Sequence, residues 1–113
     1  MVTEEQVGVK CLMLWGEKDQ IRQTMEECAE LIVKLAKYKR NVNGSTKEQI
    51  AEEIADVEIM CKQMRIVFSN ELVDSFKIQK LAKLNERVDK ESQFIVREKS
   101  FKQKLEFPKE GYK

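Results

Sequence analysis

The chain has 113 residues, of which 42% are apolar and 36% are charged, and its formal net charge at pH 7 is +1. This length allows one domain with a hydrophobic core. The balanced charge lacks the positive excess that a duplex nucleic-acid binder needs. No stretch approaches the roughly 18 apolar residues that a membrane span requires. One proline, four glycines and many helix-forming residues exclude a turn-rich β-sandwich and predict an all-α fold.

The cysteine and histidine content excludes the usual zinc sites. Cys11, Cys28 and Cys61 are widely spaced, and the chain contains no histidine. We expect Cys28 and Cys61 to act as small buried apolar side chains. The N-terminus lacks the basic and apolar regions of a leader peptide, so the sequence predicts a protein of the reducing cytoplasm with no membrane partner.

The first half of the chain predicts two helices. Thr3 and Gln6 form a capping box, and a short helix then runs to about Trp15, where Gly16 breaks it. A longer amphipathic helix is predicted over residues 17–40, with a positively charged last turn. Its apolar stripe consists of Ile21, Met25, Cys28, Ile32 and Leu35.

A turn over residues 41–44 separates the second helix from the third. Ser45 and Glu48 predict a capping box for a helix that ends near Phe68. A further helix is predicted over residues 71–91. The apolar stripe of the third helix consists of Ile50, Ile54, Val57, Cys61, Met64 and Phe68.

The predicted helices indicate an antiparallel bundle of three to five helices, because short connections force consecutive helices to run in opposite directions. Residues 1–91 form the helical domain, and residues 92–113 form a charged C-terminal extension that continues the helix, docks on a partner subunit or frays. The apolar stripes, together with Phe94, Phe101 and Phe107, exceed what one small bundle covers. We therefore expect a homodimer or a homotetramer.

Two carboxylate pairs, Glu27-x-x-Glu30 and Glu53-x-x-Asp56, lie on the flanks of the stripes of the two central helices. Like charges at this spacing repel each other. With Asn43 as the centre of the turn, Glu30 lies level with Asp56, and the other two acids lie about 4–5 Å along the helix axes. Four oxygen donors suit Mg²⁺ or Mn²⁺. The alternative is a solvated flank neutralised by lysines.

The acids stand in a longer pattern, which comprises Trp15-Gly16, Gln20, residues 26–31 and residues 51–57. Over residues 9–90 this pattern resembles the MazG-like all-α nucleoside triphosphate pyrophosphohydrolases, whose signature is E-E-x-x-E followed by E-x-x-D. The resemblance implies a Mg²⁺-dependent hydrolase that cleaves the α–β phosphoanhydride to a nucleoside monophosphate and pyrophosphate. It also implies the catalytic and metal-binding residues, which are Glu27, Glu30, Glu53 and Asp56.

A nucleotide substrate also needs positive side chains for its phosphates and a surface for its base. Lysines and an arginine on the last predicted helix are candidates for the phosphates, and Trp15 is a candidate for stacking on the base. Solvated lysines and a tryptophan that anchors a core or an interface are the simpler alternatives. The full set of candidates for substrate binding is Trp15, Gln20, Gln23, Lys80, Lys83, Asn85 and Arg87.

Two other functions stay open at this point. The chain could be a catalytically silent helical module for interaction or oligomerisation, or an enzyme like the phosphoribosyl-ATP pyrophosphatases. The presence of all four acids favours an active enzyme over the silent module, because an inactive descendant is free to lose them.

Overall fold

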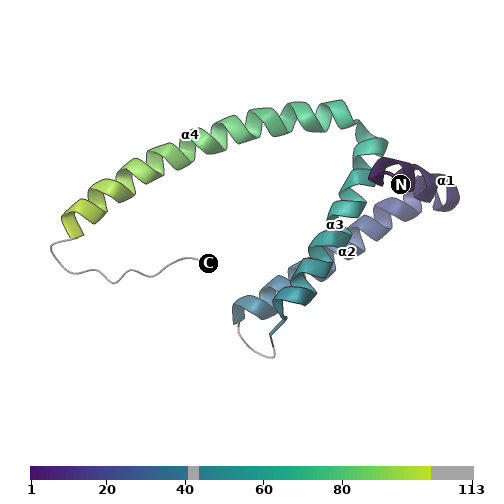
Figure 1. Ribbon diagram of the computed structural model, residues 1–113, viewed down its shortest axis with the longest axis horizontal. Helices are drawn as coiled ribbons and strands as arrows, with labels where there is room; N and C mark the ends of the chain where they lie inside the picture. Colours follow the sequence, from purple (N-terminus) through teal and green to yellow (C-terminus); the bar gives the residue numbers. More distant parts are fainter. Residues whose placement is uncertain (41–43, 103–113) are drawn as a thin grey trace. The chain divides into compact units, whose positions relative to one another are not determined.

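The computed structural model describes residues 1–40 and 44–102, which form four helices and no strand (Figure 1). They are α1 (Glu4–Trp15), α2 (Glu17–Arg40), α3 (Lys47–Phe68) and α4 (Asn70–Lys102). The prediction of an all-α chain of three to five helices is confirmed for these residues. The chain divides into two units, Met1–Val73 and Asp74–Lys113, and each is described by itself. No helix in the described ranges is both long enough and apolar enough to cross a membrane.

The predicted limits of α1 are confirmed. The Thr3 hydroxyl accepts a hydrogen bond from the Gln6 backbone N–H at 3.1 Å, and the Gln6 side chain accepts one from the Thr3 N–H at 2.9 Å. At the other end Gly16 has φ 88°, a left-handed conformation that glycine adopts without strain, and its N–H donates to the Leu12 carbonyl. The chain can therefore leave α1 and start α2 at the next residue.

The capping box of α3 differs from the predicted one by one residue. Thr46, not Ser45, is the N-cap, and it exchanges hydrogen bonds with Gln49 rather than Glu48. Both pairs have the right spacing, so the sequence alone does not choose between them. Ser45 is buried, and its hydroxyl has no partner among the described residues. Burial of Ser45 leaves Thr46 as the extended residue that precedes the first turn.

α4 is longer than the helix predicted over residues 71–91, since it continues to Lys102. Its apolar periodicity fades after Val88, but exposed ion pairs follow one another along its surface. Arg87 pairs with Glu91 at 3.1 Å, and Lys90 pairs with Glu86 at 3.4 Å. Such i,i+4 pairs add a few tenths of a kcal/mol each to a helix. These pairs lie within the predicted helix, and the extension predicted from residue 92 onward is helical as far as Lys102. Phe107 and the side chain of Phe101 lie outside the described residues.

α2 and α3 run antiparallel (Figure 1). The side chains in the seam between them are largely polar. The seam residues are buried or half-buried and recur every three or four positions, as one face of a helix does. On α2 they are Gln20, Thr24, Glu27, Leu31 and Lys34. On α3 they are Glu53, Asp56, Met60, Gln63 and Val67.

The predicted apolar stripes lie beside this seam. Apart from Ile50, each stripe residue follows a seam residue by one position, as Ile32 follows Leu31, and is therefore turned by about 100° from the seam. Because α2 and α3 are antiparallel, the same turn brings both stripes to one side of the hairpin, which we call the apolar side. Much of it is exposed, with 68% of Met25, 66% of Ile32 and 58% of Phe68 accessible to solvent.

α1 packs against α3 through its one buried residue, Gly8. A β-carbon at this position would lie 3.2 Å from the Ile66 Cδ1 atom and 3.4 Å from the Gln63 Cγ atom. The absence of a side chain therefore lets α1 approach α3 directly over Gln63. This contact closes one end of the α2–α3 seam.

Candidate metal centre

A buried hydrogen bond fixes the level at which α2 and α3 meet. The Gln20 side-chain amide donates to the Gln63 carbonyl oxygen at 2.6 Å. Counting seven residues toward the hairpin turn from each glutamine reaches Glu27 on α2 and Asp56 on α3, and ten residues reach Glu30 and Glu53. Glu30 therefore lies level with Glu53, and Glu27 lies level with Asp56.

The prediction that Glu30 lies level with Asp56 is wrong. The residue of α3 at the level of Glu30 is Glu53, three positions earlier in the chain. The prediction assumed an equal rise per residue on both sides of Asn43. Residues 44–46 are not helical, and Gly44 lies against the backbone of Lys37 and Tyr38. Thr46 is extended, with φ −79° and ψ 164°, and an extended residue rises about 3.3 Å instead of 1.5 Å, so a helical count from Asn43 does not give the level of α3.

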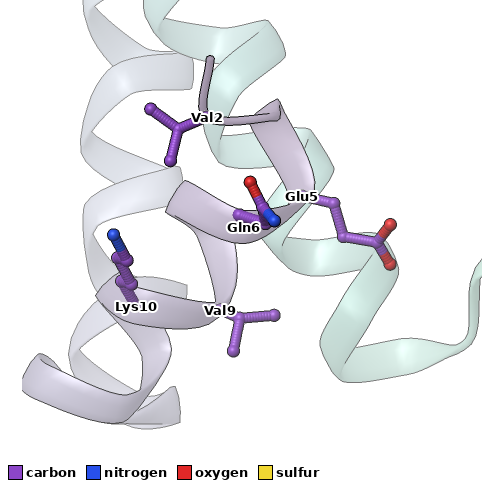
Figure 2. A pocket seen from close by; sticks show the side chains of 5 residues that line it. All are labelled: Val2, Glu5, Gln6, Val9 and Lys10. Carbon is purple, nitrogen blue, oxygen red and sulfur yellow. The ribbon is translucent and has the colours of Figure 1, made fainter.

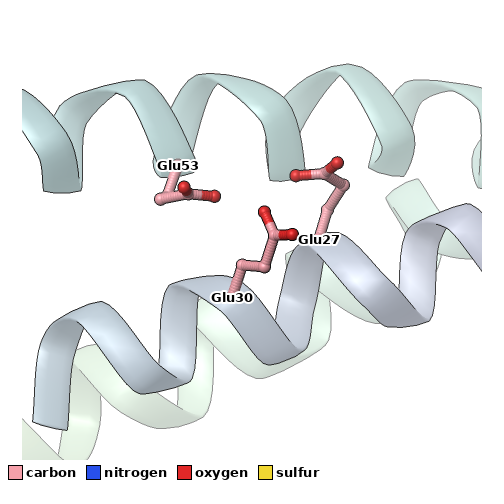
Figure 3. A group of neighbouring side chains, drawn as sticks. All are labelled: Glu27, Glu30 and Glu53. Carbon is pink, nitrogen blue, oxygen red and sulfur yellow. The ribbon is translucent and has the colours of Figure 1, made fainter.

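Three of the four predicted acids gather in the seam. One carboxylate oxygen of each of Glu27, Glu30 and Glu53 lies within 4.8 Å of the others. Figure 3 shows Glu27 and Glu30 projecting from α2 toward α3, and Glu53 projecting back from α3. In the described residues, the half-buried Asp56 lies outside this group, one turn beyond Glu53 on the same helix.

The two half-buried glutamates each keep one oxygen without a partner. Gln23 donates to the Glu27 Oε1 atom at 2.8 Å, which leaves the Oε2 atom of Glu27 buried and without a hydrogen bond in the described residues. The Oε2 atom of Glu53 is likewise buried and unpaired there. A buried carboxylate oxygen without a donor is costly, so these two atoms call for a positively charged or hydrogen-bonding ligand.

The charges of the cluster act on one another. Burial, followed by the negative charges of Glu30 and Asp56, raises the pKa of Glu53 above its usual value of 4.5. Burial also raises the pKa of Glu27, although the hydrogen bond from Gln23 opposes this effect. The contribution of Asp56 to both shifts indicates that its carboxylate lies close to the group. Both pKa values rise because the ionised carboxylates are poorly solvated and repel each other.

No cationic side chain neutralises the cluster within the described ranges. Ion pairs there join Arg22 to Asp19 at the start of α2 and basic to acidic residues along α4, and none includes Glu27, Glu30 or Glu53. Lys34, four residues after Glu30 and thus the lysine nearest to it along the helix surface, makes no such pair there. Hard carboxylate oxygens on two helices, two of them buried and unpaired, fit a divalent cation such as Mg²⁺ or Mn²⁺.

The predicted substrate-binding residues are spread over three helices. Trp15 is exposed at the end of α1, Gln20 is buried in its bond to Gln63, and Gln23 holds Glu27. The remaining candidates are exposed residues of α4, which belong to the second unit; Arg87 is also paired with Glu91. These four are Lys80, Lys83, Asn85 and Arg87.

Sequence reasoning missed Gln63 and Gly8. Gln63 is 2% exposed and belongs to the seam, yet it precedes the apolar stripe residue Met64 and resembles a solvated residue in the sequence. A glutamine on each helix at matching distances from the acids is the only signal that pointed to it.

A surface hollow on α1 lies in a different place and is lined by exposed residues only (Figure 2). These residues are Val2, Glu5, Gln6, Val9 and Lys10.

Comparisons of the chain with protein-family models, with curated proteins and with solved structures found no match. The acids of the seam and the sequence pattern around them are therefore the features that point to a function.

Proposed function

We propose that this chain is a Mg²⁺-dependent hydrolase that cleaves nucleoside triphosphates between the α and β phosphates. The observation that carries the proposal is the gathering of Glu27, Glu30 and Glu53 within 4.8 Å, with buried, unpaired oxygens on two of them. The resemblance of the acid pattern to the MazG-like pyrophosphohydrolases supports the reaction type. Asp56, close by on α3, is the fourth proposed ligand.

A divalent cation at this site would neutralise phosphate charge and lower the pKa of a bound water. The protein supplies the remaining chemistry. Gln23 donates a hydrogen bond to Glu27, and the exposed carboxylate of Glu30 is proposed to accept a proton from the attacking water. Trp15, in the same unit as the acids, is proposed to stack on the base. Lys80, Lys83, Asn85 and Arg87 belong to the second unit and stay sequence-based candidates for phosphate contacts.

The direct test is incubation of the protein with Mg²⁺ and a panel of nucleoside triphosphates that includes deoxy, methylated and oxidised forms. We expect pyrophosphate and a monophosphate, without orthophosphate from the γ position. Glu30→Ala and Asp56→Ala should lower the rate by several orders of magnitude, because a lost ligand removes stabilisation of transition-state charge. Glu52→Ala, an exposed acid on the same helix, is the matched control and should retain activity.

We also propose that two copies associate through the apolar side of the α2–α3 hairpin. Met25, Ile32, Ile54 and Phe68 are exposed there, and no residue of either stripe carries a charge. A second copy presents the same uncharged surface, so a two-fold axis would pair hairpin with hairpin into a four-helix bundle. If no nucleotide is hydrolysed, this surface favours the alternative function, a silent oligomerisation module.

A further inference from the structure

The Gln20–Gln63 pair is the most enclosed polar contact in the described part of the chain. Gln20 is 6% exposed and Gln63 is 2% exposed, and their amides meet at 2.6 Å across the seam. The Nε2 atom of Gln63 donates to the Met60 sulfur at 3.9 Å, and sulfur is a weak acceptor. Burying two amides in this way costs free energy unless they find each other.

This requirement makes the pair specific for one alignment of the two helices. If α2 slid along α3 by one turn, about 5.4 Å, the glutamines would separate and both amides would be buried without partners. The apolar neighbours Leu31, Met60 and Val67 offer no such penalty, because apolar contacts tolerate sliding. Among the seam residues, the Gln20–Gln63 pair therefore determines how α2 and α3 are aligned.

α1 seals the pair from solvent. Gly8 lies directly over the Gln63 side chain, and an added β-carbon would come within 3.4 Å of its Cγ atom. Water therefore does not reach Gln63 from this side, and exchange of the amide partner for water is suppressed. The low exposure makes the penalty for a wrong register larger than it would be on an open surface.

The acids lie two turns away on the same two helices. Glu27 is seven residues from Gln20, about 10 Å along the axis, and Glu53 is ten residues from Gln63. Their oxygens converge within 4.8 Å in the register in which the amide pair is formed. A slip of one helical turn in one direction would move both carboxylates of α2 away from Glu53. A slip in the other direction would bring Glu27 to the place of Glu30 and carry Glu30 past Glu53.

We propose that Gln20 and Gln63 are positioning residues that set the α2–α3 register and thereby assemble the divalent-cation site. The proposal rests on the metal site of the proposed function and goes beyond it, because neither glutamine contacts the cation. Supporting residues of this kind change metal affinity by roughly 10- to 100-fold when they are removed.

The test compares the affinity for Mn²⁺ alone with stability measured in EDTA, in the full chain. The double variant Gln20→Leu/Gln63→Leu removes both amides, so no unpaired polar group is left and its melting temperature should equal or exceed that of the parent. Its Mn²⁺ affinity, followed by electron paramagnetic resonance, should fall at least about tenfold. Loss of affinity without loss of stability separates positioning from a merely structural role.

Thr24→Val is the matched control. Thr24 lies in the seam between Gln20 and Glu27, but its hydroxyl donates to the Gln20 backbone carbonyl of its own helix at 2.8 Å. It should retain the parent affinity. If the double variant does not fold, Gln20→Ala, with affinity measured per folded molecule, should show the same tenfold loss.

The outcomes separate the two proposals. A parent protein that binds no Mn²⁺ would contradict the proposed function. A parent that binds Mn²⁺ as tightly as the folded double variant, or as tightly as Gln20→Ala, would overturn the positioning role and leave the metal site intact.

Discussion

Glu27 and Glu53 each hold a carboxylate oxygen away from water and near other negative charges, and this arrangement opposes folding when no cation is bound. Because the pKa of each group is raised in the folded state, each contributes stability below its usual value of 4.5. That contribution is lost as the pH rises through the raised pKa, since the folded state then has to release its proton. The site is thus least stable at neutral pH without a metal.

We therefore expect Glu53→Gln to stabilise the metal-free protein at pH 8, because the variant has no charge to repel Glu30. The difference in the free energy of unfolding between variant and parent should shrink as the pH is lowered toward 4. Urea unfolding in EDTA at several pH values measures this difference. A variant that is less stable than the parent at pH 8 would contradict the inference that the ionised Glu53 carboxylate destabilises the metal-free protein.

Mg²⁺ should reverse the order of stability of Glu53→Gln and the parent at pH 8. A ligand that binds only the folded state stabilises it by an amount that grows with its concentration. Millimolar Mg²⁺ at pH 8 should raise the melting temperature of the parent and have little effect on Glu53→Gln. Glu58→Gln, a matched change at an exposed acid on the same helix, should respond to Mg²⁺ as the parent does. Equal responses in all three proteins would argue against a site at Glu53.

At the residue scale the sequence identified the acids but not their level. The spacing of Glu27, Glu30 and Glu53 placed them on facing sides of two helices, and the structure brings them together. Their register depended on the path of residues 44–46, and extended backbone is not visible in a helical periodicity. Gln63 could not be chosen among the chain's glutamines, because burial by α1 is a tertiary effect.

At the scale of the elements, caps and glycine breaks made the boundaries predictable. The limits of α1 and α2 follow from Thr3, Gly16 and the basic last turn of α2. The start of α3 was displaced by one residue, since two overlapping capping boxes compete there. The helix predicted to end at residue 91 continues to Lys102, because helix-forming residues continue after the apolar spacing fades beyond Val88.

The two competing caps of α3 give a clear test. Thr46→Ala removes an acceptor for the Gln49 N–H and should lower the free energy of unfolding by about 1 kcal/mol. Ser45→Ala should leave stability unchanged or raise it, because the buried Ser45 hydroxyl has no partner in the described structure. Chemical unfolding of the two variants under the same conditions compares them. If Ser45→Ala were less stable than Thr46→Ala, Ser45 and not Thr46 would be the N-cap of α3.

At the scale of the whole chain, polar and apolar patterning serve different contacts. Met60 is the single apolar side chain that is buried in the described residues, whereas the seam around it is rich in amides and carboxylates. The apolar periodicity of α2 and α3 therefore marks a surface that the hairpin leaves open. A sequence pattern shows which face must be covered, but not whether the same chain or another copy covers it.

The last prediction concerns that surface. Ile32→Glu places a charge at the centre of the apolar side and should dissociate the proposed oligomer, because a buried unpaired carboxylate is costly. Val33→Glu adds the same charge one residue further along α2, turned away from both the stripe and the seam, and should leave assembly unchanged. Light scattering should give at least twice the protomer mass of 13.3 kDa for the parent and for Val33→Glu, and the protomer mass for Ile32→Glu. A parent that scatters as a single protomer at micromolar concentration would show that the apolar side stays uncovered by a second copy.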